Sequence, residues 1–303
     1  MSVNPLIVCG TGRSGTTIFT KLIGCHSDVW AFKWESQLFS GIPGFGDLIT
    51  SDFHPRLVER FPLRVKEHLF KRTVTGAKNY DAGLFEIISK EALDHALASL
   101  MEVLAAKGEK EAKIASCRIF ADAIFLPPML KKGAKIWCEK TPRNLLYAES
   151  IEKIYPQAKF INVVRDGRDV TSSALKMKFW PVARSIYFPE TLEFGGEAIF
   201  DKMVNYWTTL IDIGLEQEKK IGPARWLNVR LEDITSDPEA TFNNVLNFLE
   251  IEKSSGFYDE IRKHIRVKSG NAGRWRQDLT DEQVERFITV SRKNLLHFGY
   301  LLD

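Results

Sequence analysis

Short apolar runs alternate with amphipathic stretches along most of the 303 residues. The runs predict strands at 6–8, 134–138, 159–165 and 226–229. The stretches with apolar residues three and four positions apart predict helices after residue 17, at 87–107, 142–155, from about 170, at 197–219, after Asp237 and from Thr280. Strands that alternate with helices predict a three-layer α/β fold, with a central parallel β-sheet flanked by α-helices.

Several helix boundaries carry recognisable signals. Thr141 can cap a helix whose first position is Pro142, and Thr280 with Gln283 forms a capping-box pattern. Residues 36–80 mix glycine, proline and scattered phenylalanine, which predicts loops and short helices around a site. Neither a linker nor an internal repeat divides the sequence, so we predict one domain over residues 1–303.

Composition narrows the classes of function. A net charge of +3 is too small to argue for nucleic-acid binding. The four cysteines are scattered and the six histidines show no metal-ligand spacing, so we expect free thiols and no metal. No apolar run reaches the roughly 20 residues of a membrane span. Because the first residues also lack the pattern of a signal peptide, we expect a cytoplasmic protein without a membrane span.

The stretch VCGTGRSGTT at 8–17 predicts a phosphate-binding loop between a strand and a helix. Gly10 and Gly15 have the spacing of a triphosphate-binding P-loop, but Thr16 stands where that loop has lysine. Since this lysine reaches the β- and γ-phosphates, its loss favours a smaller group, such as a 5′-phosphate that carries one further group. Arg13 supplies a planar fork of donors instead. The alternative is a tight turn without a ligand.

A second polar stretch, VVRDGRDVTSS at 163–173, again lies where a predicted strand ends and a helix begins. Ligands of open α/β sheets bind at the carboxyl ends of the strands. Arg165 and Ser173 could therefore reach one anion there, although an exposed charged turn is the alternative for this stretch alone. Two anion sites on one P-loop-like sheet suggest a nucleotide with phosphates at both ends of its ribose.

With both motifs in place, the sequence resembles the sulfotransferases that use 3′-phosphoadenosine 5′-phosphosulfate (PAPS). The similar segments are GRSGTT at 12–17, CEKTP at 138–142, Arg165 to Ser173, VRLEDI at 229–234 with Asp237-Pro238-Glu239, and GNAGRW at 270–275. They extend over nearly the whole chain, and they look most like the bacterial and tyrosylprotein branch. The aryl branch differs, because it has lysine in the first loop, a catalytic histidine and an Arg-Lys-Gly where this chain has Lys268-Ser269-Gly270.

The resemblance implies a set of residues that bind PAPS and its product 3′-phosphoadenosine 5′-phosphate (PAP). For the 5′-phosphosulfate these are Gly12, Arg13, Ser14, Gly15, Thr16 and Thr17. Arg165 and Ser173 would hold the 3′-phosphate. The late segment would close over the cofactor with Lys268, Gly273, Arg274 and Trp275, of which Trp275 would pack near the adenine. No metal is implied.

The resemblance also implies in-line transfer of a sulfuryl group to a hydroxyl or amine of an acceptor. Glu35, in FKWESQ, lies at a distance behind the loop similar to that of the catalytic glutamate of the tyrosylprotein branch, and would be the general base. Arg13 and Lys140 would stabilise charge on the bridging oxygen. A cation at the start of a helix opposes the helix dipole, which favours a functional reason for Lys140.

The acceptor is the least determined part. Aromatic and proline residues in 36–80, at 179–181 and at 187–189 suit an apolar or aromatic body, and core packing explains them equally well. We expect a small metabolite or natural product, with a saccharide or a peptide tyrosine as alternatives. A P-loop kinase or hydrolase would need lysine at position 16, and a non-catalytic PAP-binding protein would not need Glu35 and Lys140.

Overall fold

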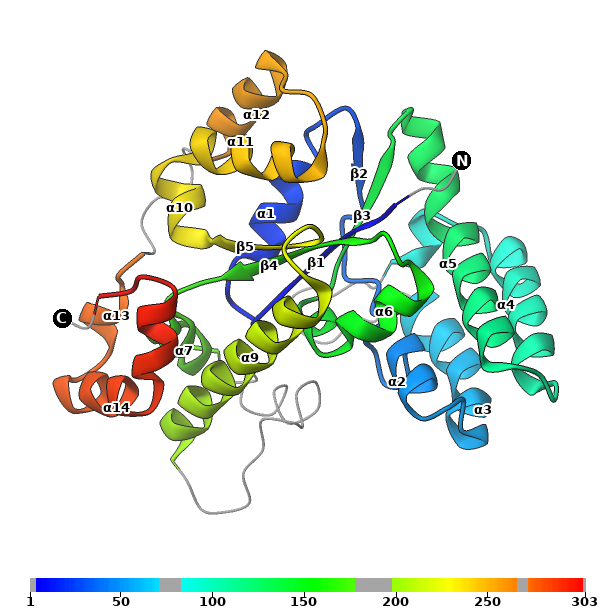
Figure 1. The fold of residues 1–303 in the computed structure, drawn as a ribbon, viewed down its shortest axis with the longest axis horizontal. Helices are drawn as coiled ribbons and strands as arrows, with labels where there is room; N and C mark the ends of the chain where they lie inside the picture. Colours follow the sequence, from blue (N-terminus) through cyan, green and yellow to red (C-terminus); the bar gives the residue numbers. More distant parts are fainter. Residues whose placement is uncertain (1–3, 71–82, 178–197, 266–271, 302–303) are drawn as a thin grey trace.

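Five parallel strands form the centre of the protein in a computed structural model, which describes residues 4–70, 83–177, 198–265 and 272–301 (Figure 1). The strands are β1 (Leu6–Gly10), β2 (Val29–Ala31), β3 (Ile136–Lys140), β4 (Lys159–Val164) and β5 (Trp226–Arg230), in the order β2-β3-β1-β4-β5. Every neighbouring pair is parallel, and β1 is central between β3 and β4. The predicted parallel sheet is confirmed.

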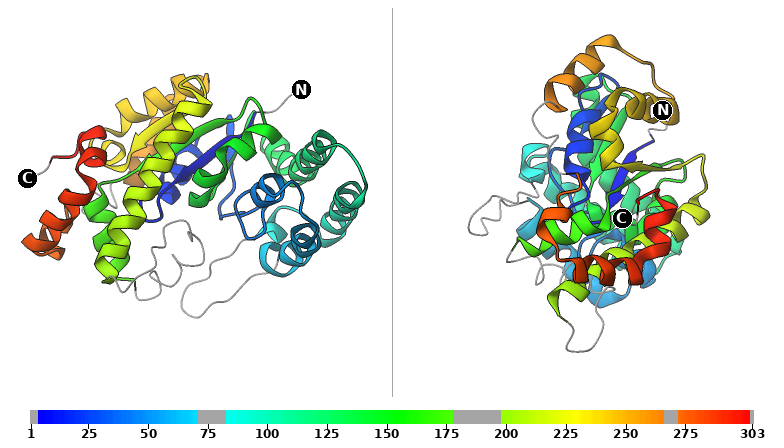
Figure 2. Two further views of the ribbon diagram at one scale, coloured as in Figure 1. Left: turned by 60° about the horizontal axis from the view of Figure 1, so that its bottom comes forward. Right: turned by 90° about the vertical axis from the view of Figure 1, so that its left-hand side faces the viewer.

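Helices cover both faces of the sheet (Figure 2). The alternation of side chains along β1 explains this arrangement. Leu6 and Val8 belong to one apolar cluster, whereas Ile7 and Cys9 belong to the other. The first cluster is completed by α1 (Thr16–Ile23), α11 (Pro238–Leu249) and α12 (Ser255–Ile265). The second cluster is completed mainly by α5 (Lys110–Lys132), α6 (Ala148–Ile154) and α9 (Ile199–Ile221). The three-layer α/β architecture follows from this two-sided burial.

Further elements extend the second layer at both ends. Towards the β2 edge these are α2 (Phe45–Thr50), α3 (Pro55–Arg64), the π-helix Val65–Phe70, the 3₁₀-helix Leu84–Glu86 and α4 (Lys90–Ala105). Towards the β5 edge these are α7 (Gly167–Leu175), α13 (Trp275–Asp278) and α14 (Asp281–His297), whereas α10 (Leu231–Ser236) packs with the first cluster. Figure 1 shows the two groups on opposite sides of the strands. In the described parts of the chain, no helix is long and apolar enough to cross a membrane.

The structure corrects several sequence-based boundaries. The strand predicted at 134–138 lies at Ile136–Lys140, and β2, α5 and α12 were not predicted at all. Pro127 and Pro128 lie inside α5, where proline normally interrupts a helix. Pro142 opens a 3₁₀-helix, Pro142–Tyr147, ahead of α6. Thr141 makes no cap hydrogen bond, because its hydroxyl oxygen accepts from the Gln37 N–H and its proton goes to Glu139. The caps predicted at Asp237 and Thr280 are confirmed.

Candidate functional site

The loop between β1 and α1 has a backbone that few residues other than glycine could adopt. Gly10 has φ +147°, and a Cβ there would lie 2.4 Å from the carbonyl oxygen of Val163 on β4. Gly15 has φ +95°, and a Cβ there would lie 2.6 Å from the side chain of Leu231. Arg13 also has a positive φ, +73°. A left-handed non-glycine residue is costly and is often found at functional sites, so the conformation of Arg13 points to a role for this loop.

The start of α1 can attract an anion. No side chain caps this helix, and its first turn contains no acidic residue. Helix N-termini attract anions through free N–H groups and the helix dipole. Two polar groups of the loop already have structural partners: the Gly12 N–H donates to the Tyr206 hydroxyl at 2.6 Å, and the Ser14 hydroxyl donates to the Thr11 carbonyl at 2.7 Å. The Ser14 side chain therefore shapes the loop.

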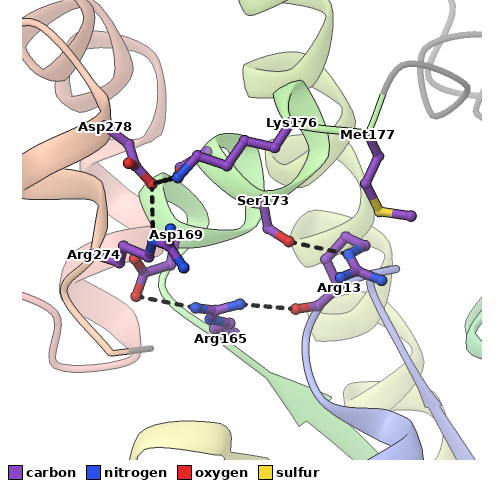
Figure 3. A pocket seen from close by; sticks show the side chains of 9 residues that line it. Arg13, Arg165, Asp169, Ser173, Lys176, Met177, Arg274 and Asp278 are labelled. Atoms are coloured by element: carbon purple, nitrogen blue, oxygen red, sulfur yellow. Dashed lines mark hydrogen bonds and ion pairs between the residues drawn. The ribbon is translucent and has the colours of Figure 1, made fainter. Parts of the chain in front are cut away.

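The two predicted anion motifs meet in space. Arg13 Nε donates to Ser173 Oγ on α7 at 3.1 Å, and Arg165, at the end of β4, donates to the Arg13 carbonyl at 3.3 Å (Figure 3). These residues line a cavity of about 290 Å³ at the carboxyl edge of the sheet. Its lining comprises Arg13, Arg165, Asp169, Ser172, Ser173, Lys176, Met177, Arg274 and Asp278. The prediction that Arg165 and Ser173 share a site with the first loop agrees with this arrangement.

Cations outnumber carboxylates in this cavity, four to two. The two carboxylates hold three of the four cations in place: Asp278 contacts Lys176 at 2.5 Å and Arg274 at 3.5 Å, and Asp169 contacts Arg165 at 3.5 Å. The bond from Lys176 lowers the pKa of Asp278, so this acid is charged at neutral pH. A cavity with a surplus of fixed cations and several N–H and hydroxyl donors suits a phosphate group.

Asp169 connects the late segment to α7. Its carboxylate accepts hydrogen bonds from the backbone N–H groups of Gly273 at 2.8 Å and Trp275 at 2.9 Å. Burial raises the pKa of Asp169, and Arg165 opposes this effect. Gly273 thus acts through its backbone, with φ +72°, while Arg274 next to it reaches the cavity.

Trp275 does not line the cavity. Its ring is 4% exposed and lies between two guanidinium groups, 3.9 Å from Arg168 and 4.3 Å from Arg276. Such cation–π contacts fix the ring against α7. Lys268, which the resemblance implies as a cofactor-binding residue of the late segment, lies outside the described residues.

A second polar group lies at the carboxyl ends of β2 and β3. Lys140 Nζ contacts Glu35 Oε1 at 2.8 Å and donates to Thr17 Oγ1 on α1 at 3.2 Å. The Lys140 side chain is 4% exposed, whereas that of Glu35 is 38% exposed. The lysine is therefore held in the protein interior at the start of α1, and the carboxylate is open to solvent. The structure brings together Glu35, Lys140 and the loop, as their predicted roles require.

Comparisons with known proteins agree with this geometry. A sequence model described as "Sulfotransferase family" matches residues 5–255. The chain belongs to the sulfotransferase family. The protein-tyrosine sulfotransferase of Drosophila melanogaster is 24% identical over 249 residues, which are 82% of this chain and 38% of that protein. The omega-hydroxy-beta-dihydromenaquinone-9 sulfotransferase Stf3 of Mycobacterium bovis is 25% identical over 170 residues, which are 54% of this chain and 39% of that protein.

This member of the sulfotransferase family thus spans less than half the length of those two relatives. Among solved structures, the sulfotransferase domain from the curacin biosynthetic pathway superimposes with a TM-score of 0.59, at 14% identity and with 99% of each chain covered. Sulfotransferase STF9 from Mycobacterium avium gives a TM-score of 0.54 at 14% identity, with 99% of this chain and 78% of that chain covered. These likenesses confirm the predicted fold class, and the family match confirms the resemblance on which the site prediction rested.

Asp169, Lys176 and Asp278 line the cavity and Glu139 is buried beside Lys140, and none of these four residues was predicted from the sequence. Glu139 on β3 is fully buried, and burial raises the pKa of its carboxyl group, against the effect of its hydrogen bonds from Thr141, Asn144 and Ser36. The available signal was a carboxylate inside an otherwise apolar strand, where an acid is rarely found without partners.

Within the described ranges, no group of three or more histidine, cysteine, aspartate or glutamate residues is arranged to hold a metal ion. All four cysteines are free thiols, and three of them are buried.

Proposed function

We propose that the protein transfers a sulfuryl group from PAPS to a hydroxyl or amine of an acceptor, with Glu35 as general base. The observation that carries the proposal is the convergence of the loop, Ser173 and Arg165 around one cationic cavity, with Glu35 and Lys140 at the same edge of the sheet. A triphosphate-binding protein would need a lysine where this loop has Thr16, and the cavity lies where a second phosphate could be bound instead.

The donor set fits the two phosphate ends of PAPS. The uncapped start of α1, the Arg13 guanidinium and the hydroxyls of Thr16 and Thr17 would hold the 5′-phosphosulfate. Arg165, Ser173 and Arg274 line the cavity that would hold the 3′-phosphate. When bound, PAPS supplies the sulfuryl group, and PAP is the leaving group.

The protein's own residues would position the reactants and stabilise charge, as in phosphoryl transfer. The Glu35 carboxylate is exposed enough to meet an acceptor and would take its proton. Lys140 is fixed between Thr17 and Glu35 at the start of α1, and we assign to it the stabilisation of charge that would develop on the bridging oxygen. Arg13 would neutralise the same charge from the loop.

The acceptor we propose is a small molecule with a hydroxyl group. The two relatives described above are a protein-tyrosine sulfotransferase and an omega-hydroxy-menaquinone sulfotransferase, whose names indicate a phenolic and an aliphatic hydroxyl. The segment at 178–197, which includes two of the predicted acceptor stretches, lies outside the described residues. The proposed acceptor class therefore rests on the family's transfer of a sulfuryl group and on Glu35 as the base that would take a proton from the acceptor.

The proposal is tested by incubating the protein with ³⁵S-labelled PAPS and two probes, N-acetyltyrosinamide for a phenol and 1-octanol for an alcohol. We expect labelled sulfate ester from at least one probe, and a loss of about 10²- to 10⁴-fold in Glu35→Ala. The Asp122→Asn variant, which alters a carboxylate on α5 that accepts from the Tyr155 hydroxyl, is the control. Tight binding of PAP without transfer to any of a broad set of hydroxyls and amines would contradict the proposal.

A further inference from the structure

Two consecutive residues of β3 contact two consecutive residues of the segment after β2. Lys140 contacts Glu35, and Glu139 accepts hydrogen bonds from both the backbone N–H and the hydroxyl of Ser36. Because side chains alternate along a strand, Glu139 and Lys140 point to opposite faces of the sheet. The segment that carries Glu35 is therefore held from two directions by one end of β3.

Four donors converge on the buried Glu139 carboxylate. Oε1 accepts from Ser36 N at 3.1 Å, from Ser36 Oγ at 2.8 Å and from Thr141 Oγ1 at 2.7 Å. Oε2 accepts from Asn144 Nδ2 at 2.6 Å. A buried carboxylate persists in the charged form only when donors surround it, and this one has donors on both oxygens.

The same partners also hold the residues that follow Ser36. The Gln37 N–H donates to Thr141 Oγ1 at 3.2 Å, and the Leu38 N–H donates to Ser36 Oγ at 3.2 Å. The hydroxyls of Thr141 and Ser36 each accept from a backbone N–H, so each has its own proton free to donate to Glu139. This fixes the direction of both hydrogen bonds to the carboxylate. Further along, Ser40 Oγ donates to Asn144 Oδ1 at 2.7 Å.

From this arrangement we infer that Glu139 is a positioning residue, which fixes the backbone behind Glu35 so that its carboxylate stays against Lys140. The inference rests on the proposed function of Glu35 and adds a residue to it. Glu35 itself is more than one-third exposed on the side chain, so packing restrains its carboxylate little beyond the ion pair with Lys140. Its neighbour Ser36 is fully buried, and it is Ser36 that Glu139 holds.

The competing explanation is that Glu139 contributes only to the stability of the fold. The two explanations differ in what happens when Glu35 is absent. A positioning residue has nothing to position in a Glu35→Ala background, so its substitution should then have no further effect on turnover. A residue that only stabilises the fold would have the same effect in both backgrounds.

The variant of choice is Glu139→Gln, which keeps the size of the side chain. Its amide nitrogen must face either Asn144 Nδ2 or the three donors at Oε1, so at least one donor loses its acceptor. Ser36→Ala is the second variant, because it removes one bond to Glu139 and the acceptor of the Leu38 N–H without placing a new group in the core. Asp122→Asn on α5 is the matched control for a carboxylate-to-amide change.

Transfer from ³⁵S-labelled PAPS to the probes above is measured for the single variants and for Glu35→Ala/Glu139→Gln. We expect kcat to fall by about 10- to 100-fold in Glu139→Gln, with KM for PAPS unchanged. Ser36→Ala should show a smaller loss of the same kind. The double variant should be as active as Glu35→Ala alone. Unchanged kcat in Glu139→Gln, or equal losses in the two backgrounds, would overturn the inference.

Hydrogen exchange separates this inference from the proposed function. In Glu139→Gln, the amides of residues 36–38 should exchange faster than in the wild type, whereas Asp122→Asn should leave them unchanged. If the wild type shows no transfer, the proposed function fails, and unchanged exchange at 36–38 would then overturn the positioning role as well. If Glu35→Ala is fully active, the base has been assigned wrongly and Glu139 positions no base.

Discussion

Replacing Ser173 by alanine should weaken the binding of PAP without weakening the binding of 5′-AMP. Ser173 Oγ lies 3.1 Å from Arg13 Nε, in the cavity that we assign to the 3′-phosphate. The two ligands differ only in that phosphate. The substitution removes one hydroxyl, which is also the acceptor of Arg13 Nε. The binding of 5′-AMP therefore reports any effect on the loop, and the difference between the two ligands isolates the second anion site.

The expected magnitude follows from the surroundings of Ser173. A hydrogen bond to a charged group contributes about 1.5–3 kcal/mol, and about 1.4 kcal/mol corresponds to a factor of ten in Kd. Since Ser173 is half-buried, we take the lower end of that range, which predicts Kd for PAP about tenfold higher than in the wild type.

Isothermal titration calorimetry with both ligands measures the effect. The control is Ser116→Ala, because this serine donates to a backbone carbonyl within α5 and does not line the cavity. It should leave both affinities unchanged. Equal weakening of PAP and 5′-AMP in Ser173→Ala, or no weakening of PAP, would refute the assignment of the cavity to the 3′-phosphate.

Three further predictions concern Lys140, Gly15 and Glu139. Lys140→Met should lower kcat for sulfuryl transfer by at least about 100-fold with KM for PAPS unchanged, because Lys140 would act on charge that develops in the transition state; an equal loss through KM would contradict this role. Gly15→Ala should lower the melting temperature and abolish PAP binding, since a Cβ would lie 2.6 Å from Leu231 at a φ of +95°; calorimetry that shows normal binding would contradict it. The pKa of Glu139 is raised in the folded state, so its contribution to the free energy of unfolding should fall as pH rises above about 4.5. In urea unfolding, the stability of Glu139→Gln relative to the wild type should therefore increase between pH 4.5 and pH 7.5. The opposite trend would contradict the raised pKa.

The parts of the site that could be predicted are those marked by short motifs of neighbouring residues. A glycine loop after an apolar run, and an arginine at the end of another run, identify two strand ends. Carboxyl ends of parallel strands meet at one edge of the sheet, so the contact between Arg13 and Ser173 follows from topology once the strands are known. Lys140 and Glu35 were found through the family resemblance, and their contact agrees with it.

What was missed depends on tertiary packing. β2 has only three residues, and its pairing with β3 gives it its extended form. Helix α5 contains two prolines, and its buried face against the sheet compensates for them. Thr141 was interpreted as a helix cap, because the sequence does not show that the partner of its hydroxyl is the buried carboxylate two residues earlier. Glu139 was overlooked for the same reason, since its partners lie up to about 100 positions away in the chain.

We infer that Thr16, at the position of the P-loop lysine, and the cavity beside the loop select a nucleotide with phosphates on both ends of its ribose. A thermal-shift titration with PAP, with ATP–Mg²⁺ in parallel, tests it most directly. A ligand present at 100 times its Kd should stabilise the native state by about 2.7 kcal/mol. We predict a concentration-dependent rise in melting temperature with PAP and none with ATP–Mg²⁺. A rise with ATP–Mg²⁺ alone would contradict the account.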